Sequence, residues 1–164
     1  MNYKAVCLVI VLSSIAFAQD RAAVRKAEDT CGPRDAKFAI SGDKSQHPTP
    51  GPEPGKARVY LLGDASYGVD GQWVGSVKRT YSSISLEPGM HHVCARYSHW
   101  VPFYIGIIIP VKITHYSLHS LDAKEGEAYY FEFPQGMNWE LTQLDRDEGV
   151  RQVAAARYST SRPK

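Results

Sequence analysis

Polar and apolar residues alternate in two short segments, SSISL at 82–86 and AYYFEF at 128–133. A period of two places the apolar side chains of a β-strand on one face. The predicted apolar faces carry Ile84 and Leu86 in the first segment, and Tyr129, Phe131 and Phe133 in the second. A third segment, ARVYLL at 57–62, is rich in residues that favour strands. All three segments are therefore predicted to be strands.

Two turn signals separate further strand-like segments. The Asp-Gly pair at 70–71 stands between short apolar runs, and both residue types accept the positive φ values that a two-residue hairpin turn requires. Glu-Pro-Gly at 87–89 marks a second turn, and HHVCARY at 91–97 follows it as the next strand. Many short strands at this spacing predict a mainly β fold, an antiparallel β-sandwich of the immunoglobulin-like kind.

The pattern becomes helical in the segment 144–158. Asp145 has the position of an N-cap, and Glu148 follows three residues later, which is the spacing of a capping box. The apolar positions that recur at helical intervals are Val150, Val153 and Ala154. Gly149 weakens the prediction by about 1 kcal/mol relative to alanine. We expect a short C-terminal helix here.

The most apolar stretch lies at 101–113, with Lys112 as its one charged residue. The favoured interpretation is a buried strand pair that bends at Gly106 or Pro110. The alternative is an exposed apolar loop that contacts a partner or a membrane surface. The stretch is too short to span a bilayer.

Residues 1–18 have the pattern of a secretory signal peptide. Lys4 precedes a short apolar run, and the run ends in Ala-Phe-Ala ahead of Gln19. Cys7 lies inside the run and not at the cleavage point, which argues against a lipid-anchored form. We therefore expect an exported chain, periplasmic or secreted, that begins at Gln19 and has no transmembrane span.

The remaining chain divides into three parts. Residues 19–55 form an N-terminal segment that ends in a Pro/Gly-rich linker, 56–156 form the β-sandwich domain with its helix, and 157–164 form a flexible tail. The whole chain has 19 basic and 17 acidic residues. Because Lys4 leaves with the signal, the net charge falls to about +1, which gives no overall attraction for nucleic acid.

Only Cys31 and Cys94 follow the predicted cleavage point. Two cysteines in an oxidising compartment most simply form a disulfide. The bridge would close a long loop, which is worth roughly 4 kcal/mol in the chain-entropy model. A free catalytic thiol beside His92 is the alternative.

Adjacent histidines at 91 and 92 suggest a metal site. On a strand, His91 shares its face with Val93, Ala95 and Tyr97, whereas His92 shares the other face with Cys94 and Arg96. The two imidazoles therefore point apart, and His91 is expected at the edge of the core with a hydrogen-bond partner. Zinc also requires three or four ligands. The weak candidates are His92, His115 and His119, and we expect no metal or other cofactor.

The common catalytic motifs are absent: the sequence has no G-x-S-x-G, phosphate loop or H-E-x-x-H. We therefore predict no enzymatic activity. Trp73, Trp100 and Trp139 are candidates for contact with a sugar or peptide ligand, although packing in the core or at its rim would also accommodate them.

Several short motifs together resemble one bacterial family. In chain order they are CGP at 31–33, Phe38, GKARVY at 55–60, DGQWVG at 70–75, EPGMHHVCA at 87–95, EGEAYYF at 125–131 and LDRDEG at 144–149. They are similar to the domain-of-unknown-function family numbered twenty-eight forty-six, which occurs in exported proteins and lipoproteins. The DG-x-x-x-G and PG-x-H pieces also resemble the PEGA-type surface domain. The resemblance implies a β-sandwich in the cell envelope and no known activity. The segment HWVPFYIGIIIPVKI at 99–113 departs from the family pattern.

These observations predict a non-catalytic exported protein of the bacterial cell envelope or secreted fraction, with an unknown envelope partner or ligand. A carbohydrate- or peptide-binding module is the alternative, and a metal-binding protein is the third candidate. An apolar contact through 101–113 would suit the first two functions.

Overall fold

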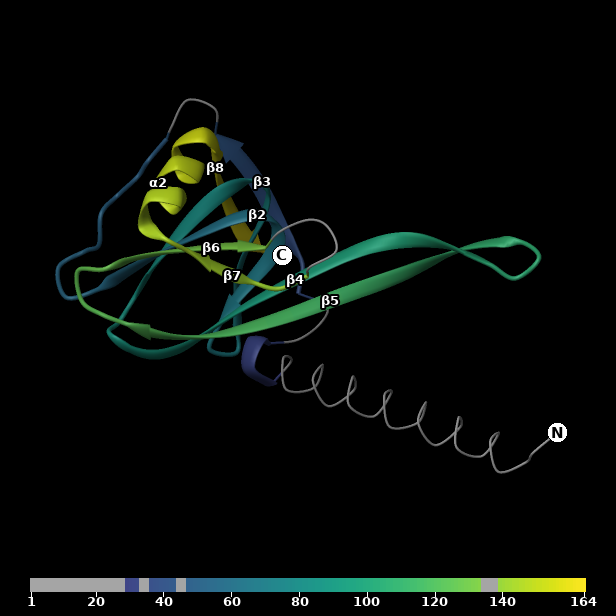
Figure 1. Cartoon of the computed structure of the whole chain (residues 1–164), viewed down its shortest axis with the longest axis horizontal. Helices are drawn as coiled ribbons and strands as arrows, with labels where there is room; N and C mark the ends of the chain where they lie inside the picture. Colours follow the sequence, from purple (N-terminus) through teal and green to yellow (C-terminus); the bar gives the residue numbers. More distant parts are fainter. Residues whose placement is uncertain (1–28, 33–35, 44–46, 134–138) are drawn as a thin grey trace.

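The computed structural model describes residues 29–32, 36–43, 47–133 and 139–164. The strands in these residues form one β-sheet (Figure 1). They are β1 (Phe38–Asp43), β2 (Ala57–Val69), β3 (Gln72–Leu86), β4 (Gly89–Tyr104), β5 (Ile108–Ala123), β6 (Ala128–Phe133), β7 (Thr142–Leu144) and β8 (Arg157–Pro163). Helix α2 (Arg146–Ala155) lies between β7 and β8. The predicted signal peptide and its cleavage point lie outside the described residues.

The sheet branches at β2, because one edge of this strand pairs with two different strands. The strand order is β1-β8-β3-β2-β4-β5, and β3 pairs with β2 along its whole length. On the other edge, the first half of β2 pairs in parallel with β6, and the second half pairs antiparallel with β4. The predicted antiparallel sandwich is not shown. The described strands instead form one mixed, strongly curled sheet, in which β2–β6 and β3–β8 are parallel pairs.

The main core lies inside this curl. Its buried side chains come from β2, β3, β4, β5 and β6, together with Leu141. The alternation predicted for 128–133 is confirmed, because Phe131 and Phe133 are buried there and Tyr129 packs against them. Ile84 and Leu86 pack on the same core, as their spacing predicted.

Helix α2 covers a smaller apolar cluster on the other side of β2, β3 and β6. This cluster contains Tyr60, Leu62, Tyr81, Tyr130 and Val153. The predicted cap is confirmed, since the Asp145 side chain accepts a hydrogen bond from the Glu148 N–H at 2.9 Å. Gly149 is buried against Tyr130, and a Cβ atom at this position would overlap the Cβ and Cγ atoms of the tyrosine side chain. Close packing therefore explains the glycine that weakened the sequence prediction.

Both predicted turns are present. Asp70 and Gly71 have φ values of 49° and 82° and connect β2 to β3 through the pair Val69 and Gln72. Residues 87–88 separate β3 from β4, as the Glu-Pro-Gly signal predicted.

The C-terminal segment differs from its prediction. Instead of a flexible tail over 157–164, Arg157–Pro163 forms β8, which pairs antiparallel with all of β1 and in parallel with β3 at two residues. Ser159 is buried and accepts a hydrogen bond from the Thr80 hydroxyl at 2.8 Å. Strand β1 takes up residues that the sequence assigned to the N-terminal segment and linker. Neither strand has alternating apolar positions, because polar residues dominate β8 and the apolar residues of β1 are consecutive at 38–40.

Candidate functional site: an exposed apolar arm

The far end of the β4–β5 hairpin, residues 100–113, extends beyond the rest of the described molecule, and α2 lies at the opposite end (Figure 1). We call these residues the arm. Its two strands pair in register as far as Tyr104 and Ile108, and the connection bends at Gly106, where φ is 90°. The predicted strand pair and its bend at Gly106 are therefore confirmed.

The predicted burial of this segment is wrong. Nine of the twelve large apolar side chains that are exposed among the described residues belong to the arm: Trp100, Phe103, Tyr104, Ile105, Ile107, Ile108, Ile109, Val111 and Ile113. Tyr104 is 75% exposed and Ile108 is 71% exposed. Among the residues that the structure describes, no other strand lies beside the arm to cover these side chains, because the curled part of the sheet ends before it (Figure 1).

Both faces of the arm are apolar. Directly paired residues of an antiparallel ladder lie on the same face. One face, which continues the core side of β4, therefore carries the pairs Val101–Val111 and Phe103–Ile109, and the other carries Pro102–Pro110 and Tyr104–Ile108. Trp100 pairs with Lys112 on this second face, at the base of the arm. A surface hairpin normally has one polar face, so this pattern indicates surroundings that cover both faces.

The hairpin that carries the arm also has an uneven charge. Residues 88–121 contain no aspartate or glutamate, but they include Arg96, Lys112 and five of the six histidines of the chain. The acidic residues therefore lie in the rest of the molecule. This end of the protein is therefore neutral to positive.

A stack of rings lies behind the arm, on the core side of β4 and β5. Trp139 stacks on His115 at 4.4 Å and on His99 at 5.1 Å between ring centroids, and Tyr97 stacks on the same tryptophan. His99 and His115 also stack on each other. Burial, with repulsion by His99, lowers the pKa of His115 below its usual value. The stack therefore favours neutral His115.

The histidine pair at 91 and 92 contacts the hairpin turn between β2 and β3. His91 Nδ1 lies 2.6 Å from Asp70 Oδ2, and its Nε2 lies 2.7 Å from the carbonyl oxygen of Glu87. Both of these oxygens accept hydrogen bonds, so both nitrogens donate when the ring is protonated. Asp70 Oδ1 accepts a further bond from the backbone N–H of His92 at 2.8 Å. The expected hydrogen-bond partner of His91 is confirmed.

These contacts change two pKa values. Burial alone would lower the pKa of His91, but its hydrogen bonds to Asp70 and Glu87 and the Asp70 charge raise it above the usual value. Burial would likewise raise the pKa of Asp70, but the His92 N–H and the His91 ring lower it instead. The pair is therefore stabilised in its charged form and joins two turns. Its geometry favours a structural role.

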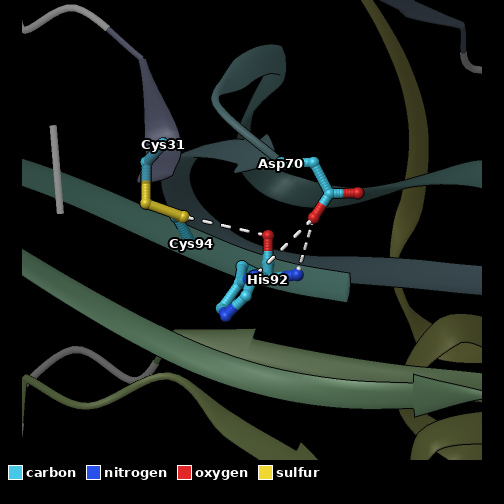
Figure 2. Close-up of a disulfide and its surroundings, with 4 residues drawn as sticks. All are labelled: Cys31, Asp70, His92 and Cys94. Atoms are coloured by element: carbon cyan, nitrogen blue, oxygen red, sulfur yellow. Dashed lines mark hydrogen bonds and ion pairs between the residues drawn. A yellow bond between two sulfur atoms is a disulfide. The ribbon is translucent and has the colours of Figure 1, made fainter. Parts of the chain in front are cut away.

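The predicted disulfide between Cys31 and Cys94 is present (Figure 2). Both cysteines are fully buried, and their Cα atoms lie 5.7 Å apart, within the range that a bridge requires. Cys94 faces away from the main core and towards the N-terminal segment, as the alternation of β4 predicted. Figure 2 also shows His92 beside the bridge, with its carbonyl oxygen 3.9 Å from Cys94 Sγ. The bridge leaves neither thiol free as a nucleophile.

The three tryptophans have separate environments. Trp73 is buried beside the disulfide, with the guanidinium of Arg96 4.6 Å from its ring centroid. Trp139 belongs to the ring stack, and Trp100 is exposed on the arm. Among the described residues no ring contact joins them, so they do not form the single platform that a sugar-binding module would use.

The candidate metal ligands are also separated. His92 lies on the disulfide side of β4, His115 is in the ring stack, and His119 packs edge-on against Phe131. In the part of the chain that the structure describes, no three residues of the metal-binding types come together. The three histidines that the sequence singled out therefore have no common centre.

A groove of about 500 Å³ lies between α2 and the proline-rich segment 47–52. The Tyr60 hydroxyl donates to the carbonyl oxygen of Pro50 at 2.6 Å, and Tyr81 donates to that of Pro48 at 2.9 Å. Two tyrosines therefore hold part of the predicted linker against the sheet. No local pattern indicated these contacts, because they join residues 10 and 33 positions apart along the chain.

Comparisons with protein families, with curated proteins and with solved structures find no match for this chain. Among the described residues, no helix combines the length and the apolar character needed to cross a membrane.

Proposed function

We propose that this chain is an exported, non-catalytic binding protein that attaches through the arm to another component of the cell envelope. One observation carries the proposal: the arm exposes nine large apolar side chains on both faces of a two-stranded ribbon. Contiguous apolar surface of this kind is rare on free-standing soluble proteins and marks interaction sites. The arm therefore serves as an attachment element.

Two further features support this proposal. The buried Cys31–Cys94 bridge suits an oxidising, extracytoplasmic compartment. His91, the histidine with the strongest carboxylate contact, already has an oxygen partner at each ring nitrogen, which argues for a structural and not a catalytic role. A bacterial envelope and a relation to PEGA-type surface domains remain predictions from the sequence motifs.

Cell fractionation with an arm variant tests the proposal. The variant replaces Ile107 and Ile108 with asparagine, and Met90→Asn is the matched control, since Met90 is 64% exposed at the other end of β4. We expect the natural chain and the control in the particulate part of the exported fraction, and the arm variant in its soluble part. Equal distribution of all three, or a chain that stays in the cytoplasm, would contradict the proposal.

Peptide binding is the second candidate, and the groove beside α2 favours it. Proline-rich segments commonly dock in aromatic-lined grooves, and here the hydroxyls of Tyr60 and Tyr81 donate to carbonyl oxygens of the chain's own segment 47–52. Titration calorimetry with a peptide of sequence HPTPGPEP tests whether the groove also accepts a separate segment. The double variant Tyr60→Phe, Tyr81→Phe should lose any binding, and the absence of heat with the natural chain would exclude this function.

A further inference from the structure

We infer that the arm binds the surface of a lipid bilayer rich in anionic lipids. The inference rests on the proposed attachment function and names its partner. Lipid surrounds an inserted element on all sides, whereas a protein groove covers one face. The paired positions show apolar residues on both faces of the arm and isoleucines on both sides of Gly106 at its tip.

The length of the arm fits shallow insertion. The four residue steps from Trp100 to Tyr104 span about 13 Å along the strand, less than half of the roughly 30 Å hydrocarbon core. The arm therefore reaches the boundary between headgroups and acyl chains of one leaflet, and it cannot span the bilayer. Open strand edges are excluded from the hydrocarbon interior, and shallow insertion leaves these edges within reach of headgroups and water.

The base of the arm has the chemistry of a membrane interface. Trp100, 66% exposed, pairs across the strands with Lys112. Tryptophan and tyrosine favour the headgroup level, and a lysine there extends its ammonium group towards lipid phosphates. Because residues 88–121 contain no acidic side chain, this end of the molecule meets an anionic surface without repulsion. Charge complementarity therefore favours anionic lipid over a neutral bilayer.

A proline pair argues against a second copy of the chain as the partner. The carbonyl oxygen of His92 accepts from the Asp70 N–H, on the side of β4 that faces away from β5. Backbone groups of alternate residues point to the same edge of a strand, so Pro102 also faces away from β5. Pro110 is its direct partner and faces the outer edge of β5. The outer edges of β4 and β5 therefore each lack a backbone N–H donor, at Pro102 and at Pro110. This hinders a further strand from pairing with either edge of the arm.

Vesicle binding by the purified, oxidised protein tests the inference. The probes are vesicles of phosphatidylcholine with and without phosphatidylglycerol, and the readout is co-sedimentation. We expect binding to the anionic vesicles and at least tenfold weaker binding by the variant Ile107→Asn, Ile108→Asn. Met90→Asn should bind as the natural chain does. Lys112→Gln should lose about fivefold on anionic vesicles, the effect of one lysine at a charged surface, with little change on neutral ones.

Three outcomes would overturn the inference. The first is equal binding by the arm variant and the Met90→Asn control, which would place the contact elsewhere. The second is no vesicle binding although fractionation shows attachment through the arm; the proposed function would then stand, with a protein as the partner. The third is a dimer in sedimentation analysis that the arm variant abolishes and that vesicles do not dissociate, which would make a second copy the occupant.

Discussion

His91 and Asp70 are joined by a contact of 2.6 Å between Nδ1 and Oδ2, although one residue lies in β4 and the other in the turn between β2 and β3. The same carboxylate accepts the backbone N–H of His92, and the same imidazole reaches the carbonyl oxygen of Glu87. Two neighbouring hairpin turns are thus connected through one charged pair. A histidine doublet that suggests metal binding in the sequence therefore contributes to stability.

This pair predicts how stability depends on pH. The pKa of His91 is raised from 6.5, so its contribution is complete below pH 6.5 and is lost as the pH rises through the raised value. The pKa of Asp70 is lowered from 3.8, so its contribution is complete above that pH and is lost as the pH falls through the lowered value. Urea unfolding should therefore show the largest contribution of the pair to the free energy of unfolding between pH 3.8 and pH 6.5. We expect a loss of about 1 kcal/mol at alkaline pH, a small value because Asp70 is half exposed.

The variant Asp70→Asn provides the control for this pH dependence. Asparagine accepts the positive φ of the turn, so the hairpin should be retained while the charge is removed. The variant should show a smaller decline in stability on deprotonation of His91, because only the hydrogen bond to the Glu87 carbonyl oxygen would still favour the protonated ring. A profile parallel to that of the natural chain would show that another group is responsible.

The disulfide predicts a specific pattern among serine variants. Cys31→Ser and Cys94→Ser should each reduce the free energy of unfolding by a similar amount, up to roughly 4 kcal/mol for a loop of this length. The double variant should be no less stable than either single variant, because all three lose the same bond. Urea unfolding measures the loss. Thiol titration of the denatured, unreduced natural chain should find neither Cys31 nor Cys94 free, and two reactive thiols from this pair would disprove the bridge.

Local signals were sufficient for much of the fold. The Asp-Gly turn, the alternation in 128–133 and the Asp145 cap each depend on neighbouring residues, and each is confirmed. The direction of the Cys94 side chain followed from alternation along β4. The oxidising compartment expected for an exported chain suggested Cys31 as its disulfide partner. These features were predictable because backbone geometry and side-chain alternation act over a few residues.

Features that depend on distant contacts were not predictable in this way. The parallel pairing of β6 with β2 and the use of 157–163 as a strand depend on which edges meet in three dimensions. The stack of His99, His115 and Trp139 likewise needs the register of β4 and β5 and the return of a later segment. The prediction that the arm is buried was wrong because burial also depends on distant contacts. An apolar run predicts that its side chains are covered, but it does not indicate whether this chain or a partner covers them.

The close contact between Gly149 and Tyr130 predicts a reversal of helix propensity. Alanine normally stabilises a helix interior by about 1 kcal/mol relative to glycine. At this position its Cβ would overlap the Tyr130 side chain near the backbone, where the ring cannot easily move. We expect Gly149→Ala to destabilise the protein by about 1–3 kcal/mol, as overpacking does, measured as a lower midpoint in urea. Val150→Ala, at the exposed neighbouring position, should change stability much less. A more stable Gly149→Ala variant would show that α2 does not pack this closely on β6.

The paired prolines of the arm predict that their replacement promotes self-association. The double variant Pro102→Thr, Pro110→Thr restores one N–H donor to each outer edge and at the same time makes the arm less apolar. Added association would therefore come from backbone pairing and not from greater hydrophobicity. Val111→Thr is the control, because it also introduces a threonine, beside Pro110, but at a residue that already has its N–H. In analytical ultracentrifugation we expect the natural chain and the control to sediment alike, and the double variant to form larger species as its concentration rises. If the double variant sediments like the other two, the prolines do not protect the edges, and a second copy of the chain again becomes a competitor for the lipid surface.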